Sequence, residues 1–392
     1  MPVRRASLPG IFVGLCLLVT PAVLADVCEL STKPAATLLF PYFEVDLADA
    51  QGRTTLISIN NVAEEATVAR VTLWTNAGSP TLGFDLVLDP RDVQSLNLRN
   101  LLAGQIPSTD IDTALPGCSD PLVLPEADGQ DLAAWHSGAA DSQGLCRGVA
   151  GEEPELAIGY VTVDVMNQCS PFFTYPGDPA VHAGGVRYFE DGGLGLASNE
   201  NRLWGDLILI DDAGDAAQSV AAVHIRADAD QLAGSVKTFY GAGADNRAPL
   251  PSTYRGRFLS GQPAGTETSF LMWLDPISAG FLPLEGVPCG EAASFTNPCR
   301  LLQAQAYDEA GNAFGDEFLE NGSQVLRQLQ ISPAAGAGFI EARFQELVAC
   351  VLLPSIVEPR QAVMIPLLRA EGRFSAATAA VALDSTCTVV TP

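Results

Sequence analysis

Short stretches of alternating apolar and polar residues dominate the early part of the chain. Residues 54–60 (Thr-Thr-Leu-Ile-Ser-Ile-Asn) and residues 68–74 alternate with a period of two, the pattern of a β-strand with one buried face. Turn-forming residues separate them from further alternating stretches that begin near residues 84 and 93. Four short strands within about fifty residues predict an antiparallel β-sandwich, because each strand needs a second sheet to cover its buried face.

Two long segments interrupt this pattern. Residues 104–154 and 170–201 are rich in glycine, proline and polar residues. Loops of this length in a compact domain are usually functional or disordered. We therefore predict one sandwich over residues 26–245 that carries these two segments as insertions. Alternation resumes in three stretches: 157–165, 203–210 and 219–226.

The second half of the chain repeats the pattern loosely. Residues 268–275 and 302–331 alternate like strands, and a low-complexity stretch near 241–252 separates them from the first half. We predict a second sandwich over residues 246–392 and leave open whether it arose by duplication. Its remaining strands are expected at 339–344, 362–368 and 376–383. Helical periodicity is scarce, and its best candidates are two short stretches: 131–135 and 340–347.

The first 25 residues have the features of a secretory signal peptide. Arg4 and Arg5 precede an apolar stretch at 11–19, and the small residues at 22–25 (Ala-Val-Leu-Ala) provide a cleavage site. The apolar stretch is shorter than the roughly 20 residues that a membrane span needs, so an uncleaved anchor is the less favoured alternative. We expect a mature chain that begins at Asp26, carries no transmembrane segment and is periplasmic, attached to the cell surface or secreted.

The composition favours a folded protein and argues against a nucleic-acid partner. Hydrophobic residues make up 47% of the chain and charged residues 17%, which is enough apolar material for a core. The chain has 46 acidic and 21 basic residues and a net charge of −25, so it lacks the basic surface that phosphate backbones require. The oligomeric state is left open.

The cysteine count predicts disulfides. Nine cysteines are present, and removal of Cys16 with the signal peptide leaves eight (9 − 1 = 8), an even number that favours four disulfides in an exported chain. A zinc site is the less favoured alternative, because the chain has no Cys-x-x-Cys pair. Four cysteines lie on each side of the predicted domain boundary, so we expect pairing within each half. Cys289–Cys299 is the most local candidate, and Cys118–Cys146 would tie down the first insertion. The eight are Cys28, Cys118, Cys146, Cys169, Cys289, Cys299, Cys350 and Cys387.

Three short motifs lie close together in residues 39–98: Phe40-Pro-Tyr-Phe43, Gly52-Arg-Thr-Thr55 and the turn at 75–79. They resemble segments of the immunoglobulin-like or transthyretin-like β-sandwich domains of bacterial secreted and surface proteins. Together with the alternation, the resemblance predicts an all-β fold of two antiparallel, immunoglobulin-like β-sandwich domains with long disulfide-tied loops. It implies roles in adhesion, binding or surface structure and brings no catalytic residues. The two cysteines that flank a core tryptophan in antibody domains have no counterpart around Trp74.

Catalytic motifs are scarce. The chain has no Gly-x-Ser-x-Gly or His-Glu-x-x-His motif and only three histidines, of which His136 in the first insertion is the least implausible general base. Carboxylates are abundant, and a glycosidase needs only two at a suitable separation. A secreted carbohydrate-active or other hydrolase that uses loop carboxylates is therefore the alternative function.

Calcium is the one cofactor that the sequence leaves open. Asp110-Ile-Asp112 and Asp128-Gly-Gln-Asp131 place carboxylates close together in a loop, which suits a hard cation with oxygen ligands. The favoured alternative is that these aspartates cap backbone N–H groups in turns.

Aromatic residues gather in the two insertions. Loops held by a rigid scaffold commonly carry recognition sites, so these side chains are candidates for contacting a cell-surface glycan or protein. The favoured alternative is that they pack beneath the loops. The candidates are Trp135, Phe172, Phe173, Tyr175 and Tyr188. Our first hypothesis is an exported, non-catalytic protein of cell-surface structure, adhesion or ligand binding, and a weaker one is subunit assembly by strand addition at an open sheet edge.

Overall fold

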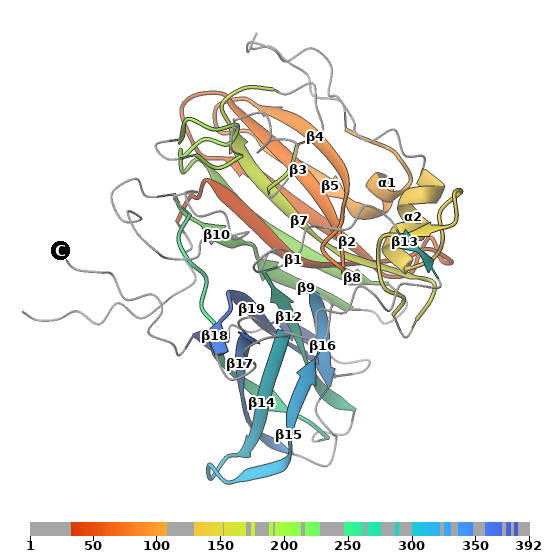
Figure 1. Cartoon of the computed structure of the whole chain (residues 1–392), viewed down its shortest axis with the longest axis vertical. Coiled ribbons are helices and arrows are strands. Elements are labelled where there is room, and N and C mark those ends of the chain that lie inside the picture. Colours follow the sequence, from red (N-terminus) through yellow and green to blue (C-terminus); the bar gives the residue numbers. More distant parts are fainter. Residues whose placement is uncertain are drawn as a thin grey trace, which may run out of the picture.

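The computed structural model describes most of the chain outside the N-terminal segment. The described residues are 33–107, 129–151, 153–169, 174–176, 188–190, 193–212, 216–227, 247–261, 265–275, 287–289, 300–321, 325–330, 336–347, 357–370, 374–377 and 380–382. Within them, antiparallel strands dominate, as the alternation predicts (Figure 1). Neither described helix is long and apolar enough to cross a lipid bilayer.

Two sheets are built from the first half of the chain. In sheet 1 the strand order is β10-β1-β7-β3-β4, with β1 (Thr37–Asp46), β3 (Thr67–Thr75), β4 (Pro80–Leu88), β7 (Leu156–Met166) and β10 (Val223–Ile225). In sheet 2 the order is β5-β2-β8-β9, with β2 (Thr54–Asn61), β5 (Val93–Asn97), β8 (Leu203–Asp211) and β9 (Ala216–Ala221).

Two further sheets come from the second half. In sheet 3 the order is β16-β12-β19-β20, with β12 (Thr266–Leu274), β16 (Leu326–Gln330), β19 (Ala362–Ala370) and β20 (Phe374–Ala377). In sheet 4 the order is β15-β14-β17-β11-β21, with β18 paired to β17. Its strands are β11 (Thr253–Leu259), β14 (Arg300–Asp308), β15 (Ala313–Asn321), β17 (Ala337–Leu347), β18 (Val357–Pro359) and β21 (Val381–Ala382).

The remaining elements lie at one end of the first half. The helices are α1 (Leu98–Leu102) and α2 (Gly129–Ser137), and the second contains the helical stretch predicted at 131–135. A two-stranded ribbon pairs β6 (Leu145–Cys146) with β13 (Val287–Pro288), so it joins one strand from each half of the chain. In Figure 1, β13 lies beside α2.

The helix predicted at 340–347 is wrong, because this segment is part of β17. Ile340, Ala342 and Phe344 are all buried, which is a period of two along the chain. Strands β11 and β14 flank β17 on both sides and supply its backbone hydrogen-bond partners. The strand predicted at 339–344 is thus confirmed, and tertiary pairing outweighs the weak helical period.

Sheet 1 is buried on both faces, whereas the alternation predicts only one buried face. Val71 of β3 is the register partner of Val163 of β7 and of Phe84 of β4, and all three belong to the apolar core. Their chain neighbours Arg70 and Asp85 project from the opposite face and are also buried. Polar positions in these strands are therefore not solvent positions.

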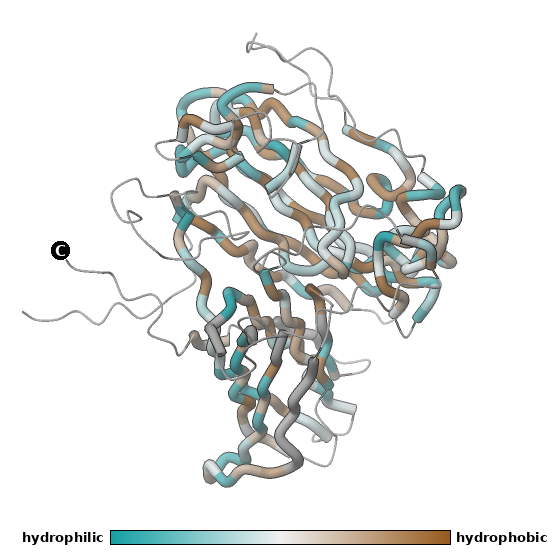
Figure 2. Tube along the Cα trace, in the orientation of Figure 1, coloured by the Kyte–Doolittle hydropathy of each residue, from teal (hydrophilic) through white to brown (hydrophobic). Residues whose placement is uncertain are grey.

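Sheet 3 is shared between two cores. Leu271 and Trp273 of β12 pack into the core of the first half, and Phe270, Met272 and Leu274 belong to a second core between sheets 3 and 4. Successive residues in a strand point to opposite faces of the sheet, so a strand buried on both faces carries a continuous apolar run. This explains the run at 270–274, where hydrophobic positions follow one another without alternation (Figure 2).

Polar contacts also join the halves. The backbone carbonyl of Asn76, in the β3–β4 turn, accepts from the backbone N–H of Val325 at 2.8 Å. The side chain of Gln218 on β9 donates to the Leu368 carbonyl on β19 at 3.3 Å. The carboxylate of Glu44 on β1 forms an ion pair with Arg369 on β19 at 3.3 Å. The two halves therefore share apolar, polar and charged contacts.

Candidate functional site

A row of polar side chains crosses sheet 1 from strand to strand. Asp85 of β4 is the register partner of Arg70 of β3. Asp164 of β7 is the partner of Arg70 on one side and of Thr37 of β1 on the other. Direct partners in neighbouring strands project from the same face, so the four side chains form one line on the face of sheet 1 opposite Val71 and Val163. We call this set the polar row.

The guanidinium of Arg70 is hydrogen-bonded on two sides. Its Nε and Nη2 atoms donate to the two carboxylate oxygens of Asp85 at 2.5 and 2.8 Å, which is the bidentate geometry of a strong ion pair. Its Nη1 atom donates to the hydroxyl of Thr174 at 2.7 Å. Arg70 thereby fixes the segment 174–176 to the sheet.

Asp164 is covered by groups from a third part of the chain. It accepts hydrogen bonds from the hydroxyls of Thr37 and Tyr188, the latter at 2.9 Å. Arg247 donates from Nε to the Thr37 hydroxyl and from Nη2 to the Ser198 carbonyl, both at 2.9 Å. The guanidinium of Arg247 also lies over the ring of Phe189, 4.7 Å from the ring centre. Two arginines and two aspartates are therefore enclosed together.

The enclosure shifts the pKa values of the row. Burial raises the pKa of Asp164, while the charge of Arg247 and the hydrogen bonds from Thr37 and Tyr188 oppose that rise. Burial and the Asp164 carboxylate raise the pKa of Tyr188 well above its usual value. The hydroxyl therefore stays protonated and donates a hydrogen bond to Asp164. Burial lowers the pKa of Arg70, but the hydrogen bond and charge of Asp85 outweigh that effect and leave the pKa raised.

The chemistry of the polar row is therefore that of a clamp. Together with Arg247, the row contains two arginines and two aspartates, and its four residues are each less than a tenth exposed. Buried charges that are paired and hydrogen-bonded hold their surroundings in one arrangement, and removal of one partner is costly. The row attaches the segments around Thr174, Tyr188 and Arg247 to sheet 1.

The candidate aromatic residues lie in different surroundings. Trp135 of α2 is 5% exposed, donates from Nε1 to Asp141 at 2.9 Å and stacks against the Arg147 guanidinium. Tyr188 covers the polar row, and Tyr175 contacts the ring of Trp74 edge-on at 5.8 Å. Trp135, Tyr175 and Tyr188 thus pack against different neighbours. Phe172 and Phe173 lie outside the described residues.

His136 is fully buried and uses both ring nitrogens. Its Nε2 atom lies 2.8 Å from the Thr81 hydroxyl, and its Nδ1 atom lies 3.2 Å from the Ile158 carbonyl oxygen. Burial lowers the pKa of His136 to about 4. The imidazole is thus neutral and engaged with the protein at neutral pH, with no nitrogen directed at solvent.

Asp131 caps the turn that follows α2. One carboxylate oxygen accepts from the Ser142 backbone N–H at 2.8 Å and the other from the Ser142 hydroxyl at 3.1 Å. The other calcium candidates, Asp110, Asp112 and Asp128, lie outside the described residues. Over the part of the chain that is described, no three His, Cys, Asp or Glu side chains form a group that could hold a metal. The calcium site remains a prediction.

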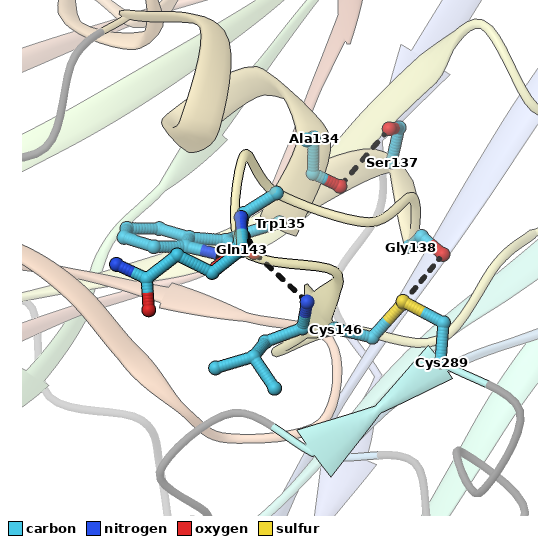
Figure 3. The surroundings of a disulfide bond; sticks show 9 residues. Ala134, Trp135, Ser137, Gly138, Gln143, Cys146 and Cys289 are labelled. Carbon is cyan, nitrogen blue, oxygen red and sulfur yellow. Dashed lines mark hydrogen bonds between the residues drawn. A yellow bond between two sulfur atoms is a disulfide. The ribbon is translucent and has the colours of Figure 1, made fainter.

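A disulfide between Cys146 and Cys289 corrects the predicted pairing (Figure 3). Cys146 belongs to the first half and Cys289 to the second, so this bond crosses the boundary that we expected disulfides to respect. Neither Cys118–Cys146 nor Cys289–Cys299 is compatible with it. The ribbon of β6 and β13 is the physical reason, because Val287 is the register partner of Cys146 and brings the next segment alongside. Cys169 is also disulfide-bonded.

The remaining predicted disulfide residues are Cys28, Cys118, Cys299, Cys350 and Cys387, which lie outside the described residues.

Sequence reasoning missed the charged members of the polar row. Arg70, Asp85 and Asp164 occupy the polar positions of alternating strands, which are usually solvent positions. The sequence did contain one signal, its composition. At the positions of β3, β4 and β7 that alternate with the core positions, most residues are threonine, glycine or large apolar residues, as expected of strands covered on both faces.

Comparisons with known proteins give no relative for this chain. No family model matches it, and no curated protein matches it. Among solved structures, it aligns with the CupB6 tip adhesin of Pseudomonas aeruginosa at a TM-score of 0.14 and 7% identity, over 84% of this chain and 85% of that chain. A TM-score this low carries no argument about fold or function.

Proposed function

We propose that this chain is an exported, non-catalytic β-sandwich protein that acts in cell-surface structure, adhesion or ligand binding. The observation that carries the proposal is the polar row together with Arg247, which covers it: the charged groups Arg70, Asp85, Asp164 and Arg247 are buried and are hydrogen-bonded by one another and by the segments they hold. A catalytic acid or base must reach its substrate within hydrogen-bond distance. These charges instead serve to make the molecule rigid.

Export is supported by two independent features. The signal-peptide pattern at the N-terminus addresses the chain to the secretory route. The Cys146–Cys289 bond belongs to a class of cross-link that persists in oxidising compartments. We infer a periplasmic, cell-surface or secreted location from the pair.

The proposed architecture is two β-sandwiches of the immunoglobulin-like class. Sheets 1 and 2 would form the first and sheets 3 and 4 the second, in keeping with the two apolar cores. Further disulfides would tie the long loops. A rigid scaffold with two apolar cores is suited to presenting a binding surface in a fixed arrangement.

The test is a binding and turnover comparison on the purified mature protein. We expect it to bind intact bacterial cells or an isolated cell-wall fraction and to release no product from polysaccharide, ester or peptide substrates. Turnover that is abolished by a single Asp→Asn substitution would establish the hydrolase alternative instead. A protein that neither binds cells nor sediments with the cell envelope would contradict the surface role.

A further inference from the structure

Sheet 2 has one face in the core and one face open to solvent. Residues of β2, β8 and β9 alternate between buried and at least partly exposed. The exposed side includes Val93 at 55% and Ile208 at 36% exposure, two of the large apolar side chains most open to solvent in the described chain. We call this outward side of sheet 2 the Asp206 face.

Charge is nearly absent from the Asp206 face. At the outward positions of its four strands, the only ionisable side chain is Asp206 itself. The other positions carry serine, asparagine, threonine, alanine, aliphatic residues and Trp204. A surface of this kind is unusual for a chain with a net charge of −25, because most of its exterior must carry the excess carboxylates.

Polar groups line up at the centre of the face. Ser95, Ser58 and Asp206 are register partners on β5, β2 and β8, and Asn60 and Trp204 are partners in the adjacent row. Asn60 donates to the Ser58 hydroxyl at 3.1 Å and to the Trp204 carbonyl at 3.2 Å, which fixes its amide and leaves the Oδ1 acceptor available.

Two groups in these rows have no partner of their own. Among the described residues, neither the Asp206 carboxylate nor the Trp204 indole N–H makes a hydrogen bond or ion pair, although the Trp204 ring packs against His224. A carboxylate acceptor, an indole donor and two serine hydroxyls thus lie on adjacent strands about 4.8 Å apart. Hydroxyl-rich ligands offer matching donors and acceptors, and their C–H faces match aliphatic neighbours such as Val93 and Ile208.

The size of the face argues against a second copy of this chain as its occupant. Four strands about 4.8 Å apart, with five to nine residues each at about 3.3 Å per residue, span about 15 Å by about 17 to 30 Å. A stable protein pair buries about 800 Å² on each partner, well above such an area. A short, uncharged carbohydrate segment fits these dimensions.

We propose that the Asp206 face binds a neutral glycan, with Asp206, Asn60 and the two serines contacting sugar hydroxyls and Trp204 donating its indole N–H. The absence of excess charge selects for an uncharged ligand, because a polyanion would gain no ion pair here and would meet the net negative charge of the molecule. This inference rests on the proposed ligand-binding function and gives it a ligand class and a site.

The test uses the full mature chain and defined polysaccharides. Dextran, a soluble β-1,4-glucan and an α-mannan serve as neutral probes, and alginate serves as the anionic probe, with affinity measured by titration calorimetry. We expect at least one neutral probe to bind, and Asp206→Asn and Trp204→Phe each to weaken that binding by about tenfold, the effect of one lost hydrogen bond to a charged or buried group. Asp206→Asn keeps the shape of the side chain, Trp204→Phe keeps an aromatic ring but removes the indole N–H, and circular dichroism confirms that both variants fold.

Glu267→Gln is the matched control. Glu267 is an exposed carboxylate on β12 of sheet 3, outside the Asp206 face, and its removal should leave glycan affinity unchanged. Binding of alginate alone, binding of no neutral probe, or equal loss in all three variants would overturn the inference. Cell binding is measured in parallel: if the parent chain and both face variants bind cells equally well, the glycan site is wrong while the proposed function stands.

Discussion

Burial of His136 couples the stability of the protein to pH. Its Nδ1 atom faces a carbonyl oxygen, so Nδ1 carries the proton and Nε2 accepts from Thr81. The pKa is about 4 in the folded state against 6.5 for a free histidine, so the unfolded chain takes up a proton first as the pH falls. The free energy of unfolding should therefore be highest above pH 6.5 and fall by up to about 3 kcal/mol as the pH is lowered towards 4.

Urea unfolding at pH 7.5 and pH 5 measures this loss. The comparison with His136→Gln isolates it, because the other titrating groups are common to both proteins and the variant should lose less stability between the two pH values. An equal loss in the parent and the variant would show that His136 does not carry the effect.

Removing one partner of the ion pair between Arg70 and Asp85 should lower the free energy of unfolding more than replacing both partners by apolar residues. Arg70→Met leaves the buried Asp85 carboxylate without its partner, and we expect a loss of about 3–5 kcal/mol in the free energy of unfolding. The double variant Arg70→Met/Asp85→Leu removes both charges and should lose less than the single one. Denaturant titration of the four proteins of this cycle gives the coupling, and a double variant weaker than either single one would contradict it.

At the scale of elements, Gly159 shows how one residue sets the packing of two strands. A Cβ atom at Gly159 of β7 would lie 2.3 Å from the Trp74 carbonyl oxygen and 2.7 Å from the Phe43 ring, both too close for a real contact. Gly159→Ala should therefore cost about 1–3 kcal/mol, as overpacking of a dense core does. Gly151→Ala is the control, because its nearest neighbour would be an Ile158 methyl at 3.9 Å. Thermal melts that shift equally for both variants would refute the assignment.

The sequence pattern predicted which segments form strands, but it did not predict which faces of those strands are buried. Period-two alternation locates β2, β3 and β4 because successive side chains of a strand point to opposite faces of the sheet. It misplaces Arg70 and Asp85, since burial of the second face depends on segments such as 174–176 that are remote in sequence. The candidate glycan site was missed for the same reason: Asp206 and Ser58 become neighbours only through the pairing of β2 with β8.

At the scale of the whole molecule, two devices hold the halves together, and they can be separated by experiment. Sheet 3 contributes Trp273 to the first core and Met272 to the second, so neither core is complete without it. The Cys146–Cys289 bond adds a covalent link across a sequence separation of 143 residues. Chain-entropy arguments give a bond over so long a loop up to about 5 kcal/mol of stabilisation.

The double variant Cys146→Ser/Cys289→Ser should accordingly melt at a lower temperature but still in one transition, because the shared sheet couples the cores without the disulfide. Calorimetry distinguishes one transition from two, and two separated transitions would mean that the disulfide, and not sheet 3, couples the halves. Proteolysis of the parent protein under non-reducing conditions should yield a Cys146–Cys289 linked peptide. Recovery of Cys146 linked to Cys118, or of Cys289 linked to Cys299, would show pairing within each half and contradict the Cys146–Cys289 bond. The packing of sheet 3 against both cores would then hold the two halves together without that covalent link.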